Sequence, residues 1–228
     1  MNIEEIHKLG AELIDILSLE TSPVAVHLVK AGEKLPENIL RIAENTRHCQ
    51  MVDNVRRNGY QFYTLLEDHM CKGGAAVMGL TEMGEKLKTG EVYYHLNHFE
   101  SLDAAKKTME KVPSIAAHSI KAVVYSPLEK TTFKPDIILI ITNPKKVMEL
   151  SQALVHKKGG RINASFAGKQ SVCADGVAYP YLSGEAGVTV GCSGSRKYTE
   201  IKDDEMIISI PVDMLPELVA SAKTMFSN

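Results

Sequence analysis

The chain has 228 residues, of which 44% are hydrophobic and 24% charged. This composition is typical of a soluble globular protein and excludes disordered, collagen-like and coiled-coil classes. The formal net charge is −2, from 26 Lys and Arg against 28 Asp and Glu, so we expect no general attraction to nucleic acid. No apolar run approaches the ~20 residues of a membrane span, and the acidic N-terminal region lacks the basic start of a secretory signal. We therefore expect a cytoplasmic protein with no membrane contact and with reduced cysteines.

The first half of the chain alternates between helical and strand-like patterns. Apolar residues from Ile3 to Leu17 recur on one helical face, which predicts a helix over 3–18. In chain order we further predict a strand over 24–29, a short helix over 36–46, a helical or irregular stretch over 50–58, a strand over 62–66, a small-residue helix entered through the glycines after Cys71, and a helix over 101–111.

The second half carries stronger local signals. The run 136–142 is apolar on both faces and predicts a central strand. Asn143 and Pro144 are typical of the cap and first residue of a helix, here 144–156, which the two following glycines end. The remaining predicted elements are strands over 119–125, 162–166, 187–190 and 206–210, a segment over 171–182 that carries a cysteine, and a closing helix over 212–226. The alternation predicts an α/β or α+β fold, a mixed sheet with flanking helices, in a single domain over 1–228.

The four cysteines show a weak internal symmetry. They are Cys49, Cys71, Cys173 and Cys192. The first two are 22 residues apart and the last two 19 apart, and the second cysteine of each pair is closely followed by glycine. This spacing favours two pseudo-symmetric halves, 1–115 and 116–228, that each deliver a pair of cysteines to a common centre.

The surroundings of the cysteines favour a functional role. None of the four lies inside a continuous apolar run, where an inert core cysteine is usually found. A thiolate beside glycines at the start of a helix gains from backbone N–H groups and from the positive end of the helix dipole. Close C-x₂₋₄-C pairs, which structural zinc sites usually use, are missing from the sequence. Four cysteines far apart in sequence can still ligate one [4Fe–4S] cluster if the fold brings them together; a structural zinc site remains the alternative.

Two further hypotheses use the same segments. The Gly-rich loops, through Gly73, Gly74, Gly194 and Arg196, have the residue types of a site for an anionic small ligand or a metallocofactor, which would make the protein a non-catalytic binding module. A thiol enzyme would need one reactive cysteine, such as Cys71 with His69 as its base. The residues alone assign no catalytic group.

Three segments carry a resemblance to a known family. The stretches HMCKGGAAVMGL, SVCADG and GCSGSRKYTEIKDDEMIISIP resemble the domain of unknown function 169 family of archaea and anaerobic bacteria, and the resemblance extends from Pro23 to Pro211. It implies that the Cys–Gly segments are family features and that the host is oxygen-poor, which favours an iron–sulfur site. We therefore expect a [4Fe–4S] protein with a redox or cofactor-related role. A redox partner or a small-molecule ligand would follow from that role, and a homodimer is an expectation for a chain of this size.

Overall fold

Six antiparallel strands form one central sheet in the computed structural model, which describes residues 1–227. The strand order is β2-β3-β1-β4-β6-β5. The strands are β1 (Val24–Lys30), β2 (Phe62–Thr64), β3 (Ile120–Pro127), β4 (Ile137–Thr142), β5 (Gly187–Thr189) and β6 (Met206–Pro211). Every ladder between them is antiparallel, and parallel pairing among the described residues is confined to two isolated bridges, Arg41–Tyr63 and Thr46–His69. The expected mixture of helices and strands is confirmed, in its α+β form.

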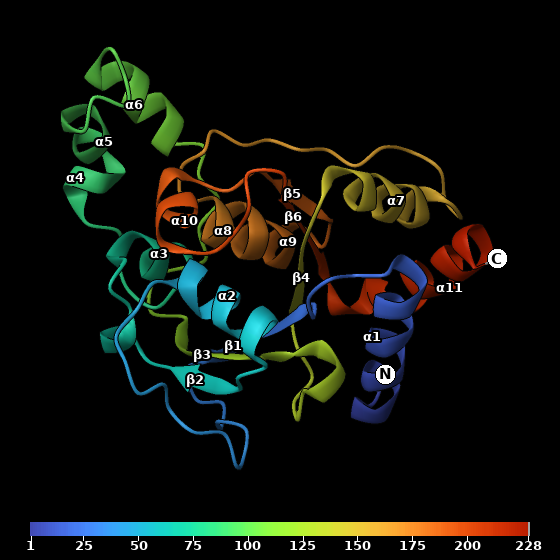
Figure 1. The fold of residues 1–228 in the computed structure, drawn as a ribbon. Helices are drawn as coiled ribbons and strands as arrows, with labels where there is room; N and C mark the ends of the chain where they lie inside the picture. Colours follow the sequence, from blue (N-terminus) through green and yellow to red (C-terminus); the bar gives the residue numbers. More distant parts are fainter. Residues whose placement is uncertain (228) are drawn as a thin grey trace.

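Most of the helices flank this sheet, while the short helices between residues 85 and 109 lie together away from it (Figure 1). The helices are α1 (Ile3–Leu17), α2 (His48–Asn58), α3 (Lys72–Val77), α4 (Glu85–Lys88), α5 (Glu91–His95), α6 (Leu102–Met109), α7 (Pro144–Val155), α8 (Ser171–Cys173), α9 (Tyr179–Ser183), α10 (Ser193–Tyr198) and α11 (Leu215–Phe226). Short 3₁₀ turns cover Leu66–Asp68, Leu128–Lys130 and Val212–Met214, and a π-helical turn over Ala174–Ala178 (η3) directly follows α8. None of the described helices has the length and apolar character needed to cross a bilayer.

The sheet separates two hydrophobic cores. Side chains alternate along β1, so Val26 and Leu28 enter one core while Ala25 and Val29 enter the other. Helices α1, α7 and α11 cover the second core, and α2, α3, α8 and η3 cover the first. Two of the four cysteines, Cys49 and Cys173, belong to the first core. The cysteine-bearing helices therefore share one face of the sheet.

Strands from both predicted halves interleave in the sheet. Strand β3 of the second half lies between β2 and β1 of the first half. Along β1 and β3, Val26 faces Tyr125. The pseudo-symmetry of the halves stays a prediction, but the two segments contribute to one continuous sheet.

Two predicted elements are wrong. Residues 36–46 form no helix, because their backbone groups pair with the edge of the sheet: Ile42 donates to the Tyr63 carbonyl at 2.9 Å and Tyr63 donates to the Leu40 carbonyl at 3.0 Å. Residues 162–166 form no strand and lie in a largely exposed loop after the positive-φ Gly159 and Gly160. The residue types of both segments suit the predicted elements. A helix over 36–46 would need backbone groups that are instead bonded to the sheet, and a strand over 162–166 would need a neighbouring strand to pair with.

A carboxylate clamp around His27 on β1 predicts a pH-dependent stability. The His27 ring bonds the Asp136 carboxylate through Nδ1 at 2.7 Å and the Glu33 carboxylate through Nε2 at 3.0 Å. Burial opposes protonation, but the two carboxylates outweigh it and raise the pKa of His27 above 6.5. A raised pKa stabilises the fold fully below the unfolded value of ~6.5, and this contribution is lost as pH rises through the folded pKa.

We therefore expect His27→Gln to lower the free energy of unfolding by about 1–3 kcal/mol below pH ~6.5, with a smaller difference from wild type at alkaline pH. Urea denaturation across this range measures it. His156→Gln, at an exposed histidine on the end of α7, is the matched control and should show no such trend. A difference that stays the same at every pH would contradict the clamp.

Candidate metal centre

All four cysteines line one cavity of about 350 Å³. Each comes from a different segment: Cys49 from the first turn of α2, Cys71 from the cap of α3, Cys173 from the end of α8 and Cys192 from the cap of α10. The structure therefore brings together side chains that lie up to 143 positions apart in the sequence. The spacing alone could not show this convergence.

Cys49 is placed by the packing of α2 against the sheet. The preceding residue, His48, is buried, and its Nδ1 shares a hydrogen bond of 2.8 Å with the hydroxyl of Tyr125 on β3. This contact holds the start of α2 over the centre of the sheet. Burial raises the pKa of the Cys49 thiol to about 12, and the neighbouring thiols of Cys192 and Cys71 add to the rise.

Gly74 lies beside two of the sulfur atoms. Its backbone N–H donates to Cys71 Sγ at 3.4 Å. A Cβ added at Gly74 would lie 3.6 Å from Cys71 Sγ and 3.5 Å from Cys173 Sγ. The absence of a side chain at Gly74 leaves open the space next to both sulfurs, while its role in binding a cofactor stays a prediction.

Cys173 is the most deeply placed of the four thiols. Its S–H donates to the Gln170 carbonyl at 3.0 Å. Burial raises the pKa of this thiol well above its ordinary value, and the other three thiols add to the rise. A bound cation or metal cluster would offset this mutual electrostatic effect and displace the thiol protons.

Cys192 begins a short helix whose first turn is closed by a side chain. The Cys192 N–H donates to Ser195 Oγ at 2.9 Å. Gly194 lines the cavity, and a Cβ there would lie 3.8 Å from Cys192 Sγ. The preceding Gly191 has φ +83°, a conformation that favours glycine.

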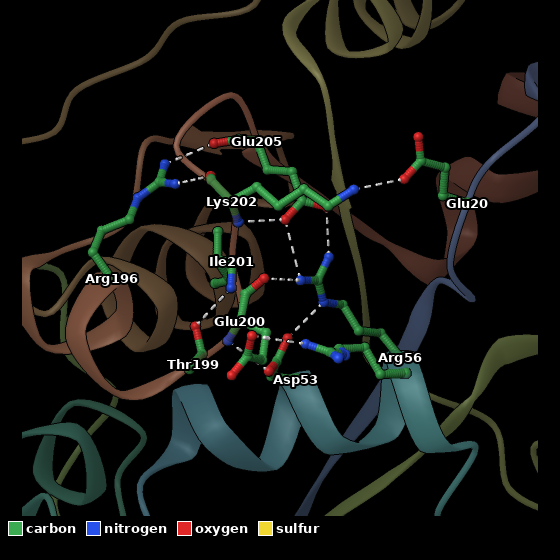
Figure 2. Close-up of polar contacts among 10 residues, drawn as sticks. Glu20, Asp53, Arg56, Arg196, Thr199, Glu200, Ile201, Lys202 and Glu205 are labelled. Carbon is green, nitrogen blue, oxygen red and sulfur yellow. Dashed lines mark hydrogen bonds and ion pairs between the residues drawn. The ribbon is translucent and has the colours of Figure 1, made fainter.

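Arg196 and Gly73 do not line the cavity, contrary to expectation. The Arg196 guanidinium donates to the carbonyl of Val190, which precedes α10. It also donates to the carbonyls of Lys202 and Glu205 in the loop after α10, as Figure 2 shows. Gly73 is a packing glycine, since a Cβ there would lie 2.6 Å from Leu87 Cδ2 and 2.8 Å from Gln170 Nε2.

His69 also lies outside the cavity, where its Nε2 bonds Thr64 Oγ1 at 2.9 Å. The geometry of the described residues therefore gives no support to a Cys71–His69 nucleophile pair.

A buried ion-pair network, defined here as Asp53, Arg56 and Glu205, connects two cysteine-bearing segments (Figure 2). Arg56 on α2 donates from Nε to Asp53 at 2.7 Å and from Nη1 to Glu205 at 2.8 Å. Asp53 in turn accepts the Glu200 N–H at 3.0 Å. The helix of Cys49 is thereby joined to the loop that follows the helix of Cys192.

Several residues that line the cavity were not predicted. They are Arg47, His48, Tyr93, Leu96, His98, Gly168, Lys169, Gln170, Val172, Ser193, Ser195, Lys197 and Tyr198. Only their closeness to a cysteine in the sequence could have identified some of them, such as Arg47 before Cys49 and Gln170 before Cys173. Tyr93 and Leu96 come from the α4–α6 region, and only the fold places that region at the cavity.

No group of three or more His, Cys, Asp or Glu side chains within residues 1–227 has the geometry to hold a single metal ion. The four thiols nevertheless line one shared cavity.

Comparison with known proteins identifies relatives without a described activity. The DUF169 family, described as "Uncharacterised ArCR", matches residues 12–221. An uncharacterised protein of Methanocaldococcus jannaschii is 39% identical over 220 residues, which cover 96% of this chain and 94% of that protein. No solved structure matches the chain.

Proposed function

We propose that this chain, which belongs to the DUF169 family of uncharacterised proteins, is an iron–sulfur protein whose four cysteines hold one [4Fe–4S] cluster in a redox or cofactor-related role. One observation carries the proposal: four thiols from four separate segments line a single cavity. Four cysteine thiolates around one centre are the usual ligand set of a [4Fe–4S] cluster.

The same four thiols suit a zinc ion in residue type, because structural zinc sites also use four cysteines. The two alternatives differ in metal content, so elemental analysis distinguishes them. Cluster sulfides also accept hydrogen bonds, and Gly74 and Gly194 leave backbone free of side chains beside Cys71 and Cys192.

The residues of the chain would determine what such a cluster does. When bound, a [4Fe–4S] cluster supplies one-electron transfer. With all four cysteines as ligands no iron is left open to a substrate, and electron transfer or sensing is favoured over Lewis-acid chemistry. The proposal includes a cytoplasmic location, where thiols stay reduced, and a redox partner or a small-molecule ligand.

Anaerobic purification with iron and sulfide analysis tests the proposal. We expect a brown protein with broad visible absorbance and about four irons per chain. A folded, colourless protein without iron, after attempted reconstitution with iron and sulfide, would overturn it. Elemental analysis that finds one zinc per chain would instead support the structural zinc alternative.

A side chain at Gly74 should block the cluster without unfolding the protein. Nothing lies closer than 3.5 Å to a Cβ at this position, so alanine fits the metal-free protein and occupies space beside the Cys71 and Cys173 sulfurs. We expect Gly74→Ala to weaken metal binding on the order of 10–100-fold, the usual effect of disturbing the surroundings of metal ligands.

Iron content after reconstitution and circular dichroism of the metal-free protein measure the two effects separately. Gly84→Ala is the matched control, because no atom lies within 4 Å of a Cβ at Gly84, which caps α4. Equal iron content in the two variants would show that the space beside the sulfurs is not used.

A further inference from the structure

The cavity that holds the thiols is strongly biased in charge. Its lining contains three basic side chains, Arg47, Lys169 and Lys197, and no carboxylate. None of the three forms an ion pair with any residue in 1–227. Most charged groups on an ordinary surface are interspersed with groups of opposite sign. Here the positive charge is left uncompensated by the protein.

Aromatic rings support all three of these cations, and Lys197 Nζ lies 5.3 Å from the centre of the Tyr198 ring. The Arg47 guanidinium lies 3.7 Å from the centre of the Tyr198 ring, and Lys169 Nζ lies 5.6 Å from the Tyr93 ring and 5.5 Å from the Phe99 ring. A cation over a ring face is held in place but keeps its hydrogen-bond donors for another partner. The rings therefore position positive charge at the cavity without neutralising it.

Gln170 presents a second, independent observation. It lines the cavity and is only 5% exposed, and neither the oxygen nor the nitrogen of its amide has a hydrogen-bond partner of ordinary geometry among the described residues. The amide nevertheless lies near enough to the Tyr93 hydroxyl to offset part of the rise that burial causes in the pKa of that group. Leaving a buried polar group unpaired is unfavourable, because the group has lost its hydrogen bonds to water. Its backbone is also in the left-handed region, at φ +52°, where side chains other than Gly, Asn and Asp are uncommon. A buried amide held in this way beside a cavity is accounted for if a ligand completes its hydrogen bonds.

We propose that this cavity binds an oxyanionic small molecule, a carboxylate or a phosphate, next to the thiols. Arg47, Lys169 and Lys197 receive its negative charge, and the Gln170 amide hydrogen-bonds it. The cavity of about 350 Å³ is within the range of small-molecule sites. The inference rests on the proposed function in one respect only, the identity of the group next to the anion. If the four cysteines hold a cluster, that cluster lies beside the bound anion.

The cations alone could serve to balance the negative charge of a thiolate-bound cluster. Gln170 distinguishes the two roles, because a neutral amide balances no charge. Its substitution should therefore weaken anion binding and leave cluster loading unchanged if the ligand exists. The test below measures the two properties separately on each variant.

Isothermal titration calorimetry of the purified full chain, metal-loaded and metal-free, with succinate and with inorganic phosphate tests the site. We expect saturable binding of one anion per chain, with the preferred probe distinguishing carboxylate from phosphate. Gln170→Met and the double variant Lys169→Gln/Lys197→Gln should each raise Kd by about tenfold or more, the equivalent of one lost charge-assisted or buried hydrogen bond. The matched control is Lys145→Gln/Lys223→Gln, which removes two exposed charges on α7 and α11, outside the cavity.

Iron analysis of each sample separates this proposal from the cluster. Anion binding with the expected variant pattern in a protein that takes up no iron supports the anion site and overturns the proposed function. A fully loaded cluster without saturable binding of either probe overturns the anion site. The anion site is equally overturned if the lysine double variant binds as well as its control; that variant changes side chains near the surface, so it keeps the test decisive even if Gln170→Met fails to fold.

Discussion

Serine at any one of Cys49, Cys71, Cys173 or Cys192 should abolish the stable [4Fe–4S] cluster. All four side chains line the cavity, and each is a required ligand if the cluster is bound by cysteine alone. We expect anaerobically purified single variants to lose most of their iron and their visible absorbance. Alanine has no atom that can bind iron, so the corresponding alanine variants control for ligation by the serine oxygen. We expect them to lose iron to the same extent as the serine variants.

The metal-free stability of these variants is the internal control. Cys71 is exposed, so its substitution should change the free energy of unfolding of the metal-free protein by no more than about 0.5 kcal/mol. Serine at the buried Cys173 keeps a donor for the Gln170 carbonyl, so its fold should also persist. Loss of iron from a folded variant then reports on ligation.

The pattern over the four variants distinguishes the alternatives. A thiol enzyme would depend on one cysteine and tolerate the loss of the other three. A binding module for an anion would keep its fold in all four variants and would contain no iron in any of them. Only its affinity for the anion would change. Iron retained in full by two or more of the single variants would contradict a cluster held by four cysteines.

The second large effect is expected at Arg56. Arg56→Met leaves the carboxylates of Asp53 and Glu205 buried without their cation, and breaking a buried pair from one side costs about 3–5 kcal/mol. Urea denaturation at neutral pH measures this loss. Because the network joins the helix of Cys49 to the loop after the helix of Cys192, the variant should also take up less iron.

The loss should shrink in acid. Burial opposes the ionisation of Glu205, but the hydrogen bonds from Arg56 outweigh it and hold the pKa of this carboxyl below its ordinary value. A lowered pKa stabilises the fold fully above the unfolded value of ~4.3, and this contribution is lost as pH falls through the folded pKa. The difference between wild type and Arg56→Met should therefore be largest above pH ~4.3.

Arg57→Met is the control for this experiment. Arg57 is the next residue on α2, exposed, and 3.5 Å from the Glu200 carboxylate. Exposed pairs contribute about 0–1 kcal/mol, so we expect a small change that does not affect iron uptake. Similar losses in the two variants would mean that the buried network does not hold the segments together.

Local signals predicted those elements whose formation depends on neighbouring residues. The helix over 144–156 is confirmed as Pro144–Val155, because Asn143 caps it by accepting the Lys146 N–H at 3.0 Å and Pro144 needs no hydrogen-bond partner at its first position. The apolar run 136–142 is confirmed as the buried strand β4. The wrong predictions over 36–46 and 162–166 fall where pairing with a distant strand, or the lack of such pairing, decides the conformation.

By itself the sequence determined the fold class, most of the helices and strands, and the choice of four cysteines outside apolar runs as candidate ligands. Only the tertiary structure decided that these cysteines share a cavity, because their meeting depends on the packing of α2, α3 and α8 on one face of the sheet. It also decided that Arg196 bonds backbone carbonyls, while Lys169 and Gln170 line the cavity. Capping and periodicity act within a few residues. A site built from segments more than a hundred residues apart exists only when strand order and packing have brought them together.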